Sequence, residues 1–350
     1  MKYLKTATPI SGEGAKIYDT LNRKKRTIFV GLIFFCAIFL ILDIVTGAAM
    51  LPVSEVLLCL FRPTQAVNTT RVIIWSMRLP IALMALVIGC SLGTAGSVMQ
   101  TILHNPLASP YTLGVGAGAS FGASLAIIMG WGEVGVSVMA FFFAMLICMF
   151  VNFMGRSRLL SSNAMVLSGI AMLFLFQALQ ALLQYDASES QNQSIIFWSF
   201  GSLQKTTWSK LGITALITTG CIPLILRNSW QYTALIMGDE KAESLGVPVN
   251  QLKLHSFFLI SLLAAASVCF TGSIGFIGLA GPHIARLLVG DDQRFYILLS
   301  GVCGAAILSA ASVLSKLVHP GIIFPIGIVT SIIGVPFFFA LVFHTKGSDG

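Results

Sequence analysis

The stretch ILHNPLASPYTLGVGAGASFGAS, residues 102–124, lies between two long apolar runs and decides how the rest of the chain is interpreted. Its second half matches the dinucleotide-binding pattern G-x-G-x-x-A. That site requires a β-strand before the glycines, and here a helix-length apolar run precedes them. Gly114, Gly118 and Gly122 are instead spaced by four, so they share one helix face. In lipid, such a face lets two helix backbones approach closely. The stretch therefore predicts a break and then a tightly packed membrane helix.

The first half of the stretch supplies the break. Pro106 and Pro110 cannot continue a helix, and Asn105 and Ser109 can satisfy the backbone groups that the break frees. The helix-break residues predicted here are Asn105, Pro106, Leu107, Ala108 and Pro110.

The composition requires lipid as part of the solvent. The chain has 350 residues, of which 56% are hydrophobic and 10% are charged, with a mean hydropathy of +0.89. A soluble domain carries about 25% charged residues. The net charge of +8 could indicate nucleic-acid binding, but no basic stripe interleaved with aromatic residues is present. The composition therefore favours an all-α polytopic protein of the cell (inner) membrane.

Ten apolar runs are long enough to be membrane helices, which need about 20 residues each. The limits of the seventh and eighth are the hardest to define, because 272–282 is rich in glycine and ends at Pro282. The predicted spans are 27–47, 79–101, 112–131, 134–154, 163–184, 209–226, 254–272, 275–290, 295–315 and 322–343.

The chain ends are predicted to lie in the cytoplasm. A lead over 1–26 precedes one transmembrane domain over 27–344, and a tail covers 345–350. A signal peptide cleaved near residues 47–49 is the alternative for the first span, but the apolar run is longer than a usual signal-peptide core. Lys and Arg prefer cytoplasmic segments. With both ends inside, only six of the 21 Lys and Arg residues lie outside: Arg62, Arg71, Arg78, Lys205, Lys210 and Lys316.

A second Gly-rich interruption, TGSIGFIGLAGPHIARLLVG, covers residues 271–290. A proline again precedes a short apolar run, and the segment follows a span of the opposite direction. Paired interruptions in opposite orientation suggest an inverted repeat, which is a common transporter design. His283 is interpreted as a structural hydrogen-bonding residue, with a proton relay as the alternative. The break residues predicted here are Gly275, Phe276, Gly278, Pro282, His283 and Arg286.

No resident metal or cofactor is expected. The seven cysteines lie mostly inside apolar runs without a C-x-x-C pair, so buried free thiols are predicted. Five scattered histidines add no metal-ligand spacing.

Several blocks resemble one transporter family. In order they are RLP at 78–80, the interrupted stretch itself, GDEKAESLGV from 238, GSIGFIGLAGPHIARLLVGDDQR from 272, and PIGIVTSIIGVPFFFALV from 325. Together they resemble the FecCD-type permeases of ABC importers for ferric siderophores, haem and cobalamin. The resemblance runs from about Arg78 to Val342, and it implies a type II importer permease with ten helices.

The resemblance also implies partners. Such permeases work as pairs, are driven by two cytoplasmic ATPases, and receive cargo from a periplasmic or lipid-anchored binding protein. The chain itself has no Walker A sequence, since Gln204 stands where Lys205-Thr206 would need a preceding glycine. ATP is therefore expected to be used by partner subunits, and the chain is expected to be a translocation subunit and not an enzyme.

Residues 227–253 form the longest internal cytoplasmic loop, and GDEKAESLGVP within it reads as a short helix. Acidic residues lie at its N-terminal end, and Gly246 can cap its C-terminal end. The resemblance implies that this is the coupling helix that binds the ATPase; a solvated loop helix is the alternative. The predicted coupling residues are Gly238, Asp239, Glu240, Ala242, Leu245 and Gly246.

Arg78 and Lys316 are the docking candidates for the binding protein on the outer face, with interfacial snorkelling as the alternative. The family pattern is incomplete here. Ile81 replaces a second arginine, while Ser312, Lys316 and Ile323 stand at the family's Asp, Arg and Glu positions. These departures suggest that a local ion pair has been relaxed. They favour a heteromeric permease pair slightly over a homodimer.

The fifth span presents three amides on one face, at spacings of three and four. Facing lipid they would be costly, so they face protein or water. The resemblance places this helix beside the pathway, and interhelical hydrogen bonds are the alternative. The pathway and gate candidates are Gln177, Gln180, Gln184, Ser161, Ser162 and Asn163.

Two other classes compete with an importer permease that carries a ferric siderophore. An ion-coupled secondary transporter would need acids in its core, but Asp43, Glu55 and Glu133 fall at the outer ends of spans. A membrane enzyme would need a clustered acid, base or metal set, and the sequence shows none. Haem and cobalamin remain alternative cargoes.

Overall fold

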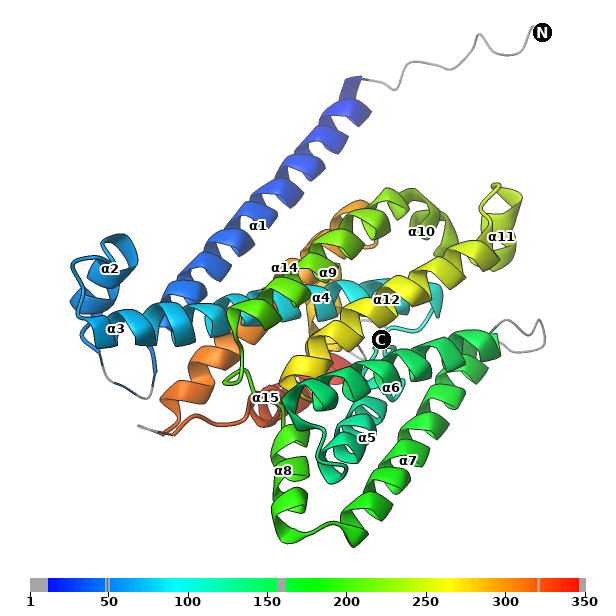
Figure 1. Cartoon of the computed structure of the whole chain (residues 1–350). Helices are drawn as coiled ribbons and strands as arrows, with labels where there is room; N and C mark the ends of the chain where they lie inside the picture. The colour runs from blue at the N-terminus through cyan, green and yellow to red at the C-terminus, as the bar shows by residue number, and fades with distance from the viewer. Residues whose placement is uncertain (1–11, 48, 50, 156–161, 320–321, 346–350) are drawn as a thin grey trace, which may run out of the picture.

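The computed structural model describes the chain apart from residues 1–11, 48, 50, 156–161, 320–321 and 346–350 (Figure 1). The described part is helical, with one isolated bridge between His319 and Ile322 as its β-structure. Within the described ranges, seven helices are long and apolar enough to cross a membrane. They lie in α1 (Gly12–Val45), α4 (Leu79–Ile102), α6 (Gly132–Gly155), α7 (Ser162–Asp186), α9 (Trp208–Arg227), α12 (Val249–Thr271) and α14 (Gln293–Leu317).

Further helices complete the fold. Three are apolar and coincide with the remaining predicted spans: α5 (Val115–Ile128), α13 (Ile277–Val289) and α15 (Ile326–Thr345). The rest are α2 (Val53–Phe61), α3 (Asn68–Val72), the π-helical turn Ile73–Arg78, α8 (Glu189–Ser199), α10 (Ser229–Leu235) and α11 (Asp239–Ser244). α3 and the π-helical turn run directly into α4, so the second span starts earlier than predicted and covers Asn68–Ile102.

α5 and α13 are shorter than the spans predicted at 112–131 and 275–290. α5 has 14 residues and α13 has 13. At 1.5 Å per residue each is about 20 Å long, whereas the apolar core of a bilayer is about 30 Å thick. An interrupted segment precedes each of them, and non-helical backbone at membrane depth is tolerated only where it lies within protein or lines a water-filled cavity.

α4 crosses the middle of the molecule between α12 and α14 (Figure 1). Its contact with α14 depends on glycine, because a Cβ atom on Gly89 or Gly93 would overlap the carbonyl oxygen of Gly304 or Ser300. Gly89 and Gly93 therefore let the backbones of α4 and α14 approach closely. The cysteines are free thiols, buried except for the half-buried Cys90, as predicted.

We expect Gly93→Ala to lower the free energy of unfolding by about 1–3 kcal/mol, because the added methyl forces α4 away from α14. Gly220→Ala on α9 is the matched control, since a Cβ there would have no neighbour within 4 Å. Thermal unfolding of the detergent-solubilised protein measures both. Equal midpoints for the two variants would contradict the close approach of α4 and α14.

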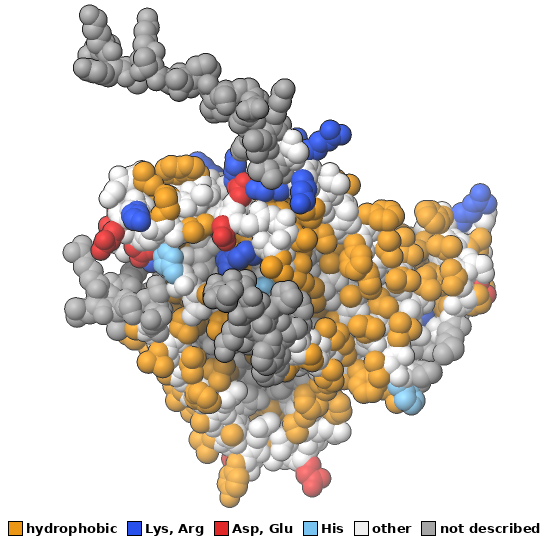
Figure 2. All heavy atoms as spheres, turned by 180° about the vertical axis from the view of Figure 1, so that it is seen from behind, with side chains coloured by type: hydrophobic (Ala, Val, Ile, Leu, Met, Phe, Trp, Pro, Cys, Tyr) orange, Lys and Arg blue, Asp and Glu red, His pale blue; other side chains and the backbone are white. Residues whose placement is uncertain are grey.

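Apolar side chains cover a broad flank of the molecule, and charged side chains lie mainly at its margins (Figure 2). Lys25, in the first half of α1, pairs with Asp292 at the start of α14, with Nζ and Oδ2 3.1 Å apart. Near the C-terminal end of α1, Asp43 contacts Lys316 at the end of α14. Ion pairs thus join α1 to both ends of α14. The predicted lead over 1–26 is helical from Gly12 onward, so α1 extends beyond the apolar run.

Candidate functional site

The first interrupted segment, residues 103–114, is held by local hydrogen bonds. Asn105 Oδ1 accepts a bond of 2.8 Å from the Leu107 amide, and Ser109 Oγ accepts one of 3.2 Å from the Thr112 amide. Thr112 Oγ1 in turn accepts a bond of 2.9 Å from the Ser109 amide. The prediction that Asn105 and Ser109 satisfy freed backbone groups is confirmed.

Glycines fix how α5 begins and packs. Gly118 and Gly122 lie against α6, where added Cβ atoms would meet the carbonyl oxygens of Phe143 and Met139. Gly114 behaves differently from the prediction, because it precedes the helix and adopts the left-handed conformation at φ +83°. Only glycine adopts this conformation at little cost. Gly114 therefore turns the chain into α5, and it also allows a close approach to α7, where a Cβ would meet Leu173 N at 2.9 Å.

The second interrupted segment, residues 272–276, ends in a similar turn. Phe276 precedes α13 with φ +65°, a left-handed conformation that is rare for a bulky side chain. The expectation that Pro282 precedes the short helix is wrong, because α13 begins five residues earlier, at Ile277. Proline at 282 leaves the Gly278 carbonyl without its helical donor. That carbonyl lies directly against Gly96 of α4, where a Cβ could not fit.

The two interrupted segments contact each other, with Ser109, Pro110 and Gly275 buried and Tyr111 44% exposed. A Cβ on Gly275 would lie 3.4 Å from the Tyr111 ring, and one on Gly278 would lie 3.5 Å from the Ser109 side chain. A small cavity of about 20 Å³ is enclosed between them, which is room for one water molecule. We call this contact region, formed by Ser109, Pro110, Tyr111, Gly275 and Gly278, the junction. The two interruptions, which the sequence related to each other only by pattern, thus also lie in contact in the fold.

α11 has the termini that the sequence predicted. Gly238 precedes it at φ +102°, Asp239 and Glu240 form its first turn, and Gly246 follows it at φ +83°. The Val247 amide donates to Ala242 O at 3.0 Å, which closes the C-terminal turn. Ala242 is fully buried against the core, whereas Leu245 is 52% exposed. α11 therefore has one face on the permease body and one face open.

Asp239 fastens α11 to two other elements. Its Oδ1 lies 3.1 Å from His104 Nε2 in the first interrupted segment, and its Oδ2 lies 2.5 Å from Lys253 Nζ on α12. The hydrogen bond with His104, helped by Lys253 and opposed by burial, lowers the pKa of Asp239 from 3.8 to about 2. Asp239 thus carries its charge throughout the physiological pH range and holds the helix, while Glu240 and Leu245 face outward.

We expect the seating of α11 to persist as the pH falls to about 4 and to be lost between pH 3.8 and about 2. A carboxyl whose pKa is lowered by folding stabilises the folded state above its ordinary pKa, and this contribution disappears as the pH falls through the lowered value. Hydrogen exchange of residues 239–247, corrected for the intrinsic rate, measures it. An identical pH profile for Asp239→Asn would refute the assignment.

The predicted docking cations have internal partners. Arg78 is only 5% exposed, and its Nη1 donates to the carbonyl oxygens of Ile44 (3.0 Å) and Val45 (2.8 Å) at the end of α1. Lys316 is 8% exposed and pairs with Asp43 at 2.8 Å. Both lie at the predicted end of the fold, but neither is exposed as the docking hypothesis assumed. Docking through Arg78 and Lys316 therefore stays a prediction that needs this end to rearrange.

The idea that a local ion pair has been relaxed is wrong. Ser312 Oγ donates to both carboxylate oxygens of Asp43, at 2.8 and 3.0 Å, and Lys316 Nζ bonds the same carboxylate. Asp43 thus provides the acid from α1. A buried acid in a membrane span is costly unless it is paired. Its position in the first apolar run was the signal that could have identified it.

α7 lies at the periphery of the molecule, because only 11% of an apolar 18-residue stretch within it is buried. Gln177 is exposed and Gln184 is half-buried, whereas Gln180 Nε2 donates to Ser199 Oγ of α8 at 3.1 Å. Ser161 lies outside the described residues, and Ser162 and Asn163 start α7 without described side chains. Of the three amides, Gln177 is therefore open, whereas Gln180 makes an interhelical hydrogen bond of the kind that was the alternative prediction.

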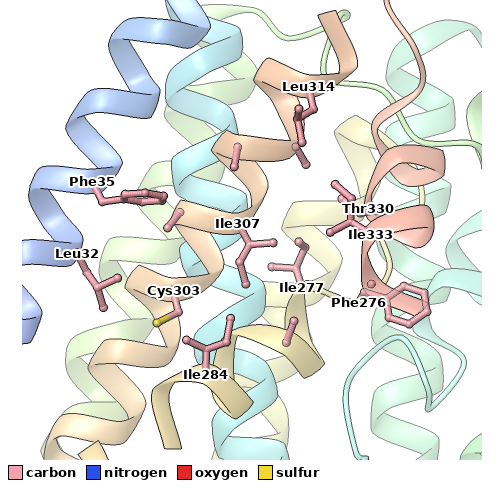
Figure 3. A pocket seen from close by; sticks show the side chains of 15 residues that line it. Leu32, Phe35, Phe276, Ile277, Ile284, Cys303, Ile307, Leu314, Thr330 and Ile333 are labelled. Atoms are coloured by element: carbon pink, nitrogen blue, oxygen red, sulfur yellow. The ribbon is translucent and has the colours of Figure 1, made fainter. Parts of the chain in front are cut away.

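A larger cavity of about 370 Å³ lies beside Phe276, between α1, α13, α14 and α15 (Figure 3). Leu32 and Phe35 bound it on one side, and Thr330 and Ile333 bound it on the other. Thr330 donates its hydroxyl to Gly327 O at 3.1 Å. The lining is otherwise apolar, so the cavity offers little to a polar cargo.

His283 and Arg286 both lie on α13, but the polar contacts described for this helix centre on Arg286. Its Nη2 donates to the Tyr296 hydroxyl at 3.3 Å, and that hydroxyl donates to Gln100 Oε1 at 2.8 Å. The chain of contacts ties α13 to α14 and α4 next to the first interrupted segment. No group of three or more possible metal ligands occurs among the described residues.

Several known proteins are similar to this chain in sequence or in structure. The FecCD transport family matches residues 35–344. A Methanocaldococcus jannaschii protein named as an ABC transporter permease is 37% identical over 92% of this chain and 95% of its own length. The Helicobacter pylori iron chelatin transport permease is 36% identical, covering 82% and 87%. A solved inward-facing metal-chelate type ABC transporter superposes with a TM-score of 0.81 at 30% identity, covering 91% and 99%. Further relatives are named for molybdate, haemin and vitamin B12 transport.

Proposed function

Because the chain belongs to the FecCD transport family of ABC permeases, we propose that it forms one half of the pathway of an ATP-driven importer whose cargo is a ferric siderophore. The observation that supports energy supply by a partner ATPase is the way α11 is held on the permease body. This helix is seated on the body by Asp239 and Ala242, and it exposes Glu240 and Leu245. This open face is available to bind an ATPase subunit.

The surroundings of α11 support the same role. Ile236 and Met237, just before the helix, are 41% and 52% exposed. Together with Leu245 they form a small apolar surface among charged side chains. An exposed apolar patch rimmed by charges is typical of a protein–protein contact. ATP hydrolysis is therefore assigned to two partner subunits that bind this surface. In this proposal both chain ends and α11 lie on the cytoplasmic side.

The open face of α7 supports pairing with a second permease. Gln177 is exposed there, and an uncompensated amide facing lipid is costly. A second subunit against α7 would place the amides along a shared pathway. We favour a different chain as the partner, because Ile81 and Ile323 depart from the family pattern on this chain.

The proposal is tested by purification and reconstitution. The tagged permease is expected to bring two ATPase copies and a second permease, which mass spectrometry identifies. In liposomes with a substrate-binding protein, uptake of a ⁵⁵Fe-siderophore is expected to require ATP on the side of the membrane where the ATPase subunits are bound. Haem and cyanocobalamin are the alternative cargoes tested in parallel. Uptake driven by an ion gradient through the bare permease would overturn the importer assignment and indicate a secondary transporter.

A further inference from the structure

Two described non-glycine residues have a positive φ, and one lies in each interrupted segment: His104 at +48° and Phe276 at +65°. A left-handed conformation is unfavourable for a residue with a side chain, and it persists only where the surroundings fix it. Glycine would adopt it without this cost. At His104 the side chain must therefore contribute an interaction that offsets the backbone cost.

The interaction of His104 is the contact with Asp239, 135 residues away in sequence. His104 lies just beyond the end of α4, where the Asn105 amide donates back to Gln100 O at 3.1 Å. Asp239 is the first residue of α11. One carboxylate thus joins the end of α4, the start of α11 and, through Lys253, the start of α12.

A stiff path leads from His104 to the junction. The Asn105–Leu107 and Ser109–Thr112 bonds fold the segment on itself, and the Val115 amide donates to Pro110 O at 3.2 Å. Tyr111, held within this fold, lies against Gly275 of the second interrupted segment. A displacement of α11 therefore has a hydrogen-bonded route through the first interrupted segment to Tyr111, whose ring packs against Gly275.

We propose that His104 is a positioning residue that transmits movement of α11 to the junction of the two interrupted segments. The inference rests on the proposed function, because the movement is supplied by an ATPase bound to α11. Lys253 holds the same carboxylate, so α11 keeps one anchor when His104 is removed. Seating of α11 and transmission from it are therefore separable.

The test compares His104→Gly with wild type. Glycine keeps the left-handed backbone and deletes the side chain, and His104→Gln restores a hydrogen-bonding group of similar reach. His255→Ala, an exposed position on α12, is the matched control. Each permease is purified with its ATPase subunits in lipid nanodiscs. Hydrogen exchange is then measured with and without ATP and vanadate, at residues 239–247 and at residues 109–117.

In wild type and His255→Ala, both regions are expected to change their exchange when ATP and vanadate are added. In His104→Gly, the change at 239–247 is expected to persist while the change at 109–117 falls about fivefold or more, and His104→Gln is expected to restore most of it. An unaltered response at 109–117 in His104→Gly would overturn the relay alone. Loss of both responses would show that His104 merely seats α11. No response at 239–247 in wild type would instead overturn the coupling role of α11.

Discussion

Replacing Asp43 with alanine is expected to lower the free energy of unfolding by about 3–5 kcal/mol, because it leaves Lys316 as an unpaired buried charge. The two side chains are 0% and 3% exposed, and Nζ lies 2.8 Å from Oδ1. Ser312 also loses its acceptor. Removing one member of such a pair costs more than the pair itself contributes, since the remaining charge has been taken out of water.

The double variant Asp43→Leu with Lys316→Met separates the cost of an unpaired buried charge from the cost of lost packing between α1 and α14. We expect it to recover most of the stability, because two apolar side chains of similar volume need no charged partner. Denaturant or thermal unfolding in a mild detergent measures all three proteins. If Asp43→Ala lowered the free energy of unfolding by less than about 1 kcal/mol, the Asp43–Lys316 pair would behave as a solvent-exposed ion pair. Water would then reach the C-terminal end of α1.

The second large effect concerns Gly246. Gly246→Val is expected to reduce ATP-driven uptake about tenfold, because valine at φ +83° costs at least 1–2 kcal/mol and the C-terminal turn of α11 must change. Space is not the obstacle, since a Cβ at Gly246 would meet nothing within 4 Å. The backbone conformation alone predicts the defect.

Gly246→Asn is the matched variant, because asparagine visits the left-handed region far more readily than a β-branched residue. We expect it to keep most of the uptake measured with the ⁵⁵Fe-siderophore. Both variants are expected to insert and to be recovered from membranes in wild-type amounts. Wild-type uptake by Gly246→Val would contradict the role of this turn in binding the ATPase.

Docking at Arg78 can be tested only together with stability. The docking hypothesis predicts that charge reversal at Arg78 weakens the affinity for a binding protein in a salt-sensitive way. Arg78 donates to the carbonyl oxygens that end α1, so its loss also unfastens α1 from the π-helical turn before α4. A docking defect is therefore informative only in a variant whose unfolding midpoint is unchanged.

Local chemistry determined much of this protein from the sequence alone. Apolar length located the membrane helices, glycine and proline marked both interruptions, and the acidic start and Gly246 defined α11. These features depend on the solvent and on a few neighbouring residues. The length of α5 and α13 was misjudged, because the apolar run extends into broken backbone that only its buried surroundings can stabilise.

Tertiary structure decided which polar groups meet. Asp43 and Lys316 are 273 residues apart, and His104 and Asp239 are 135 residues apart. Neither pair has a sequence spacing that announces it, because each forms only when separate helices dock side by side. When the helices pack together, Arg78 and Lys316 become buried, although the sequence had suggested that they lie on the surface. They then bind partners within the fold, since a charge removed from water must be paired there.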